Sequence, residues 1–263
     1  MIVIYKEICA EVNNKLNHIL EKYDISIKNF KWNQFNSMNN VNALKEYLNY
    51  IFKYMNHGLI HIHTIIWDIS DSRHDIVGRD DIENLSRMYY KLIKNFAEFK
   101  LKNGDTLSIY PDRNNDLKWE KIEEILPNDG IYNTKELSFY TLNQSKVFIN
   151  ESNTDENALI QIADIFAGLA RTSYIDYEKY EKWLNRYQQS LFPDENFDLV
   201  VTNREKHRFI IYEFIDKYSK RKSWSVSLKT NKGFSTFDMS KPLNFWFYEP
   251  QHEYDKAPRK SYN

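Results

Sequence analysis

The chain has a single cysteine, Cys9, among its 263 residues. An intrachain disulfide or a zinc site built from several thiolates is therefore impossible, and we expect a reducing compartment, the cytoplasm. Glycine and proline are also scarce, with six of each, whereas 16% of the residues are aromatic. This composition excludes a low-complexity chain and predicts an ordered globular protein.

Long apolar runs are absent as well. No segment approaches the roughly 20 apolar residues that span a bilayer, and residues 1–6 lack the basic-then-apolar layout of a signal peptide. There is no glycine-rich phosphate loop and no Gly-x-Ser-x-Gly motif, which disfavours nucleoside triphosphatases, dinucleotide-dependent enzymes and serine hydrolases. The formal net charge of −1 argues against a surface coated in basic charge but leaves room for a local basic groove.

Helices and strands are predicted to alternate along residues 1–175, which indicates an α/β domain with a mixed sheet flanked by helices. The expected helices lie near residues 6–23, 41–55, 81–100 and 119–126 and from 155 onward. The expected strands lie at residues 59–67, 106–110 and 137–142. Both faces of the first strand are largely apolar, so it is expected to be central. Residues 176–263 are expected to form an α+β extension packed on this domain, with helices near 177–190 and 204–221.

The segment from Ala158 to Arg171 predicts a buried helix with one carboxylate, Asp164. Its polar residues share one face, because they follow helical spacing: Asn157, Gln161, Asp164, Gly168 and Arg171. A buried acid must be neutralised, paired or bound to a metal. Two interpretations are open, an active-site acid or a structural contact of Asp164 with Arg171 or with the backbone.

Two further acids follow predicted strands. Asp68 comes just after the strand at 59–67, and Asp112 just after the strand at 106–110. Sites in α/β sheets gather at strand ends, so these acids and Asp164 could hold a divalent cation that supports phosphoryl chemistry. The alternative is that the two strand-end acids form turns or helix caps.

Residues 67–81 hold five aspartates, two arginines and a histidine. Arg73 and Arg79 could clamp phosphate oxygens, and His74 could transfer a proton. The alternative is an internal network of ion pairs in which Asp80 caps the next helix.

Other candidates are more typical of packing. His61 and His63 share a strand face and could bind a metal, but a packed or surface pair is favoured because no third ligand is evident. Lys31 could neutralise a phosphate, although a solvated Lys31 beside a core Trp32 is more common. The basic cluster at residues 217–222 favours the end of a helix dipole over a phosphate contact. The aromatic tail at 244–258 favours a packed strap over base stacking.

Two motifs resemble a bacterial family, domain of unknown function 3800. They are Phe30-Lys31-Trp32-Asn33 and the stretch Leu159 to Gly168, which is similar to the family's late helix, Leu-Gln-x-Ala-Asp-x-x-Ala-Gly. The resemblance implies a ribonuclease H-like fold and a nuclease that uses Mg²⁺ or Mn²⁺, with Asp68 and Asp164 as ligands and Asp112 as their neighbour. The family's opening Asp-Glu-Ser-Gly strand has no counterpart here, so the first strand or strands are expected to be missing.

These observations predict a metal-dependent nuclease or phosphodiesterase acting on nucleic acid, with bacterial defence as one setting. In this hypothesis Gln161 orients the substrate or a ligand carboxylate, and Arg73, Arg79 and Lys31 bind phosphate. The alternatives are an inactive binding module, or a structural subunit of a defence or toxin–antitoxin complex in which a protein partner or a second copy supplies the missing strands.

Overall fold

The chain divides into two compact units. The first comprises Met1–Thr64 and Asp155–Trp246, and the second comprises Ile65–Thr154 and Phe247–Asn263. The computed structural model describes residues 1–68, 80–100, 106–111, 130–133, 138–141, 146–149, 158–191, 200–228, 233–236, 238 and 240–248. The described helices of the predicted C-terminal extension belong to the first unit, so the predicted boundary at residue 175 does not separate the two units.

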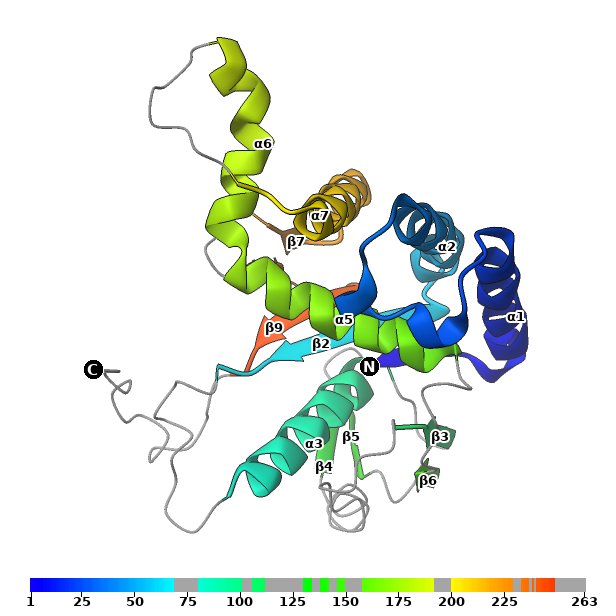
Figure 1. The fold of residues 1–263 in the computed structure, drawn as a ribbon. Coiled ribbons are helices and arrows are strands. Elements are labelled where there is room, and N and C mark those ends of the chain that lie inside the picture. Colours follow the sequence, from blue (N-terminus) through cyan, green and yellow to red (C-terminus); the bar gives the residue numbers. More distant parts are fainter. Residues whose placement is uncertain are drawn as a thin grey trace, which may run out of the picture. The chain divides into compact units, whose positions relative to one another are not determined.

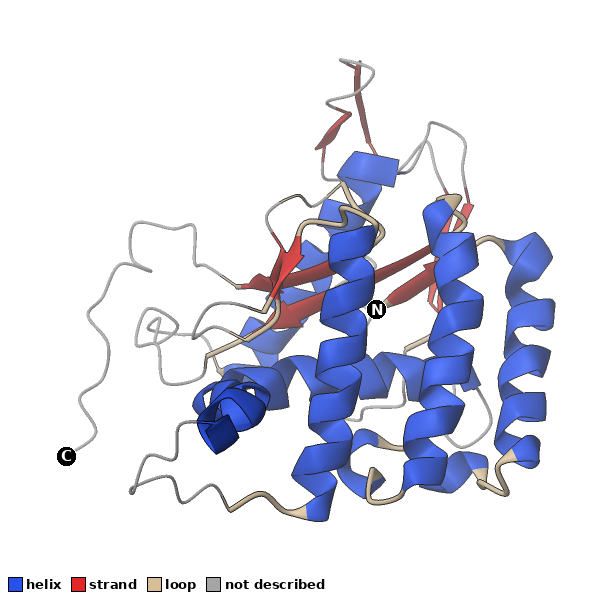
Figure 2. Cartoon of the chain, turned by 90° about the horizontal axis from the view of Figure 1, so that it is seen from above, coloured by secondary structure: helices blue, strands red, loops and turns tan. Residues whose placement is uncertain are grey.

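Helices α1, α2 and α7 lie side by side in the first unit, because α2 packs against each of the other two (Figures 1 and 2). A further helix, α5, contacts α1 and α7 and is followed by α6. The bounds are α1 Lys6–Lys22, α2 Met38–Asn56, α5 Ala158–Ile175, α6 Tyr177–Leu191 and α7 Asn203–Arg221. All five helices match predicted segments, since each carries a long apolar stripe at helical spacing.

The ends of these helices follow from local sequence. The Ser37 hydroxyl caps α2 by accepting the backbone N–H of Asn40 at 3.3 Å. Gly58, with φ of +70°, allows the chain to turn after α2. At the start of α7, Thr202 and Glu205 form a reciprocal capping box.

The sheet of the first unit has the strand order β1-β2-β9, with bounds β1 Ile2–Ile4, β2 Ile60–Ile66 and β9 Leu243–Phe247. The pair β1 and β2 is antiparallel, with Val3 opposite His61. The pair β2 and β9 is parallel, since Ile62 N–H donates to Pro242 O and Tyr248 N–H donates to Ile66 O. The prediction of a central strand at 59–67 is confirmed.

Strand β1 was not predicted. Three residues are too few to show the alternation that identifies a strand, so the pairing depends on partners distant in the sequence. The Met1 amino group donates to the His63 carbonyl at 2.8 Å, and the His63 N–H donates to the Met1 carbonyl at 2.9 Å.

The second unit contains α3 (Asp81–Lys100), whose bounds equal the prediction, and two strand pairs. Buried Met88, Leu92, Ile93 and Phe96 form the apolar side of α3. Strands β3 (Thr106–Ile109) and β6 (Lys146–Ile149) are parallel. Strands β4 (Gly130–Asn133) and β5 (Ser138–Thr141) are antiparallel. Of these strands β3 and β5 were predicted, and the helix predicted at 119–126 lies outside the described residues.

Shorter elements complete the described chain. Two single-turn 3-10 helices, η1 (Ile27–Asn29) and η2 (Trp32–Gln34), connect α1 to α2. A small antiparallel pair, β7 (Val226–Ser227) and β8 (Ser235–Thr236), follows α7. Within the described residues no helix is both long and apolar enough to cross a membrane. The described fold is thus mixed α/β, as predicted.

Candidate functional site

The loop that carries Lys31 and Trp32 is seated on α5. The Trp32 indole is 3% exposed, and its Nε1 donates to Thr172 Oγ1 at 2.9 Å. Gly168 provides the space for the ring, because a Cβ built at residue 168 would lie 2.5 Å from Trp32 Cδ1. The two motifs that carry the family resemblance therefore meet in space, and the glycine of the second accommodates the tryptophan of the first.

Helix α7 also contacts Trp32. The loop at Trp32, α5 and α7 therefore meet at one point, which we call the Trp32 junction. Tyr212 stacks on Trp32 with ring centroids 6.1 Å apart, and its hydroxyl lies 2.5 Å from Thr172 Oγ1. One turn earlier, Arg208 places its guanidinium 5.4 Å from the Trp32 ring centre and donates to the Trp32 carbonyl at 3.3 Å. Burial raises the pKa of Tyr212 and lowers the pKa of Arg208. Trp32 is thus fixed by a helix on either side.

Asp164 is exposed, so the expectation that it is a buried acid is wrong. The buried face of α5 does include Gln161, which is fully buried. The solvent-exposed residues form a separate stripe, Asp164, Ala167, Arg171 and Ile175. Gln161 and Asp164 differ by about 60° around the helix, which is enough to place one inside and the other outside. The argument that burial forces Asp164 to be neutralised no longer applies, and its carboxylate is accessible to solvent.

Three predicted site residues lie in the same part of the first unit. Gly168 follows Asp164 by one turn on the same side of α5. Because Trp32 packs on Gly168, the loop that carries Lys31 contacts α5 one turn after Asp164. Lys31 therefore belongs to a loop that packs on the helix carrying Asp164 and Gln161.

The other predicted acids follow strands. Asp68 is half-buried and comes two residues after the end of β2. It belongs to the second unit, whereas Asp164 belongs to the first. Pro111 is buried two residues after β3, but Asp112, Arg73, His74 and Arg79 lie outside the described residues. Among the residues that are described, no three carboxylate, histidine or cysteine side chains are arranged to hold a metal ion.

The remaining candidates are packed. His61 and His63 are 4% and 2% exposed, their rings are 6.1 Å apart, and His61 Nε2 lies 3.1 Å from the Gly58 carbonyl. In the basic cluster, Lys217 and Lys220 pair with Glu213 and Asp216 one turn earlier on α7. In the tail, Phe245 is fully buried in β9. The packed-pair interpretation of the histidines is confirmed, and the cluster and the described tail likewise show structural contacts.

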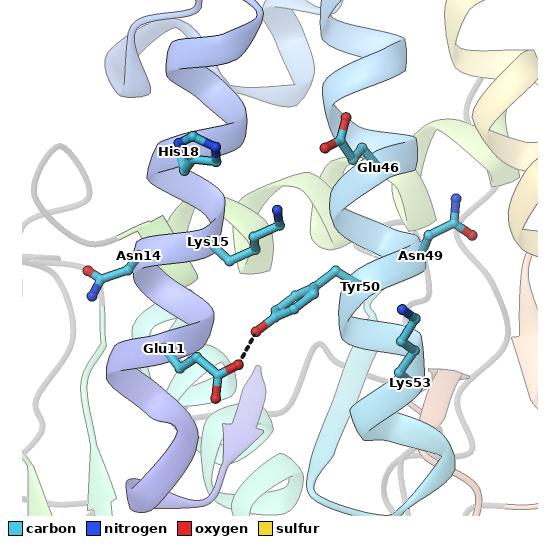
Figure 3. A pocket seen from close by; sticks show the side chains of 8 residues that line it. All are labelled: Glu11, Asn14, Lys15, His18, Glu46, Asn49, Tyr50 and Lys53. Carbon is cyan, nitrogen blue, oxygen red and sulfur yellow. Dashed lines mark hydrogen bonds between the residues drawn. The ribbon is translucent and has the colours of Figure 1, made fainter.

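A polar groove between α1 and α2 was not predicted (Figure 3). Its volume is about 660 Å³, and its lining residues are Glu11, Asn14, Lys15, His18, Glu46, Asn49, Tyr50 and Lys53. Sequence spacing gives no signal for it, because each helix contributes only what looks like an ordinary solvent-facing side. The groove appears only when the two polar faces are placed next to each other.

Hydrogen bonds already engage both carboxylates of the groove. Glu11 accepts the hydroxyls of Tyr50 at 2.6 Å and Tyr54 at 2.7 Å, and these bonds lower the pKa of Glu11 (Figure 3 shows the first). Glu46 accepts Lys22 at 2.7 Å and Tyr23 at 3.0 Å, which lowers the pKa of Glu46. The groove is therefore a mixed-charge surface suited to binding polar partners.

Comparison with known proteins finds two relatives that span nearly the whole chain. The uncharacterized protein ORF2' of Methanothermobacter thermautotrophicus is 32% identical over 256 residues, covering 96% of this chain and 87% of the relative. The uncharacterized protein ORF2 of the same organism is 32% identical over 261 residues, covering 95% and 87%. The chain belongs to the ORF2 family. The similarity includes both units of the ORF2-family fold. No family model matches the chain, and no solved structure matches it.

Proposed function

We propose that this ORF2-family protein is a divalent-metal-dependent phosphodiesterase that acts on nucleic acid, built on a ribonuclease H-like fold. The observation that carries the proposal is the position of Asp164. It is an exposed carboxylate on a helix that is otherwise largely buried, and the loop that carries Lys31 packs on the same helix at Gly168. A helix held this firmly by its buried face can present a carboxylate in a fixed position.

The proposed cation is Mg²⁺ or Mn²⁺. Both ions prefer oxygen ligands, and Asp68, Asp112 and Asp164 offer carboxylate oxygens. Asp164 is accessible to solvent, and Asp68 follows the central strand of a mixed sheet. A bound cation in such a site would activate water and offset charge on the leaving oxygen.

The chain's own side chains supply the other roles. Lys31 binds a phosphate oxygen as a point charge, and the buried Gln161 holds the position of its helix turn and orients a ligand carboxylate. Arg73 and Arg79 clamp phosphate, and His74 donates a proton to the leaving oxygen. The last three roles come from the sequence alone.

Calorimetric titration with Mn²⁺ tests the proposal. We expect binding heat in the parent protein that is lost in Asp164→Ala and in Asp68→Ala, together with cleavage of a labelled oligonucleotide that depends on the metal. Glu181→Ala removes an exposed acid from α6 and should keep both signals. Asp164 is exposed, so its removal should change the free energy of unfolding by no more than about 0.5 kcal/mol. Absence of heat in the folded parent at millimolar Mn²⁺ would rule the proposal out.

A binding module without catalysis is the second candidate, and the groove between α1 and α2 favours it. The groove has two carboxylates, which accept hydrogen bonds from nearby side chains, and a lysine on each helix. Its surface therefore carries both positive and negative charge (Figure 3). Size-exclusion chromatography with mass detection separates the candidates further, since a structural subunit should form a defined assembly and an independent enzyme need not.

A further inference from the structure

Arg208 is held in place by an aromatic ring and a backbone carbonyl. Its guanidinium is half-buried, stacks on Trp32 and donates a hydrogen bond to the Trp32 carbonyl. Its buried Nε finds no acceptor, and within the described residues no carboxylate lies within ion-pair distance of it. A guanidinium has five N–H donors, so most of the hydrogen-bonding capacity of Arg208 is unused. Partial burial of a charge is costly unless an opposite charge compensates it.

Arg171 lies close to this group. It is exposed and adjacent to Thr172, which bonds to both Trp32 and Tyr212. Arg208 precedes Tyr212 by one turn of α7, and both arginines act electrostatically on Asp176. The two arginines therefore lie on either side of the Trp32 junction.

Further charged groups surround this junction. Lys179 and Arg204 are also nearby, and so are the acids Asp176 and Glu205. Glu205 is already engaged, since it accepts Lys179 at 2.6 Å and the Thr202 N–H at 2.7 Å. Burial, and next to it the charge of Glu205, raises the pKa of Asp176.

We propose that Arg171 and Arg208 form a binding surface for the phosphate backbone of a nucleic-acid strand. Arg171 shares the exposed stripe of α5 with Asp164 and lies two turns away, about 10 Å along the helix axis. That separation would let phosphates of one strand reach both Asp164, the proposed metal ligand, and the arginines. The identity of the anion rests on the proposed function, whereas the anion-binding surface itself does not require catalysis.

The stacking of Arg208 on Trp32 pre-organises the guanidinium. A planar fork fixed in one orientation binds a phosphate without losing the side-chain freedom that a mobile lysine would lose. Arg221 provides a natural comparison on the same helix, since it also stacks on an aromatic ring, 4.8 Å from the centre of Tyr218, but lies at the opposite end of α7, beside the paired lysines.

Fluorescence anisotropy with labelled single-stranded and duplex oligonucleotides, in EDTA, tests the inference. We expect Arg171→Ala and Arg208→Lys each to weaken binding roughly tenfold. Arg171→Ala removes a charge and should reduce the slope of log affinity against log salt concentration by about 0.7–0.9, whereas Arg208→Lys keeps the charge and should leave the slope nearly unchanged. Arg221→Ala should bind like the parent. Thermal melting checks that every variant is folded. If Arg208→Lys fails to fold, the result for Arg171→Ala, which changes an exposed residue, tests the inference by itself.

The outcomes separate this inference from the phosphodiesterase proposal. Parental affinity and salt slope in Arg171→Ala, or no binding of any oligonucleotide by the parent, would overturn the arginine surface. Weakened binding in Arg171→Ala with unchanged Mn²⁺ heat would support it as a surface separate from the metal ligands. Arginine-dependent binding without any Mn²⁺ heat in the parent would keep the surface and remove the phosphodiesterase.

Discussion

The two sides of α5 differ in burial and in the kind of side chain that they carry. On the buried side, Gln161 is fully buried and Trp32 packs on Gly168. Thr172 on this side forms hydrogen bonds with the Trp32 indole and with the Tyr212 hydroxyl. The exposed side carries charged side chains, Asp164 and Arg171, separated by Ala167. The first side fixes the helix, and the second is exposed to solvent.

This difference changes how the late-helix motif is interpreted. In Leu-Gln-x-Ala-Asp-x-x-Ala-Gly, the glutamine of this chain is buried and the glycine receives Trp32, whereas the aspartate is the charged member that faces solvent. A motif shared between proteins therefore need not be a list of catalytic residues. Chemistry is better sought at the position that the packing does not require.

Removal of the Trp32 side chain from the buried side of α5 should lower the stability of the protein most. Trp32→Ala is expected to lower the free energy of unfolding by about 3–5 kcal/mol, because it leaves a cavity between α5 and α7 and removes the donor to Thr172. Trp32→Phe keeps most of the ring and should cost about 1–2 kcal/mol. Urea unfolding measures both values. Equal stability of Trp32→Ala and the parent would show that the junction does not hold α5.

A methyl group at residue 168 should have a smaller effect of the same sign. Gly168→Ala gains about 1 kcal/mol of helix propensity but forces a Cβ to 2.5 Å from Trp32, and overpacking of this kind costs about 1–3 kcal/mol. We expect a net loss of stability in urea unfolding.

A double-mutant cycle isolates the cause. In the Trp32→Ala background the added methyl group has space, so Gly168→Ala should become neutral or stabilising. A loss of stability that is the same in both backgrounds would show that the steric contact with Trp32 is not the reason.

Much of the fold could be predicted from sequence because its helices are long, and several of them have a clear apolar stripe at helical spacing. The bounds of α3 equal the prediction, and α1, α6 and α7 differ from it by one residue at an end. Strand β1 could not be predicted, since its three residues are specified by hydrogen bonds to β2 some sixty positions away. Strand β9 was expected only as part of a tail of strands and loops, because its pairing with β2 is likewise a long-range contact.

The site could be predicted less well, because side-chain exposure depends on what packs against each helix. The spacing of Gln161 and Asp164 placed them on one polar face, yet a rotation of about 60° separates a core residue from a surface residue. The role of Arg208 had no signal in the sequence, since its partner Trp32 is 176 residues away. Glu11 and Tyr50 looked like ordinary surface residues of two different helices.

The smallest expected effect concerns Asp176, the acid that follows α5. Its pKa is raised in the folded protein, whereas in the unfolded chain it is about 3.9. Ionisation of Asp176 therefore favours unfolding, and the folded state loses this stability as the pH rises from about 3.9 through the folded-state pKa. We expect Asp176→Asn to be slightly more stable than the parent in urea at about pH 7, with the difference vanishing below about pH 3.9.

The opposite result for Asp176→Asn would change the interpretation of Arg208. Lower stability of Asp176→Asn at neutral pH would mean that ionised Asp176 compensates the half-buried Arg208 across the gap between them. Arg208 would then need no external anion, and its pairing with the acid would explain its burial. A gain in stability instead leaves the guanidinium uncompensated in the free protein, which is the condition under which a phosphate of the substrate contributes most to binding.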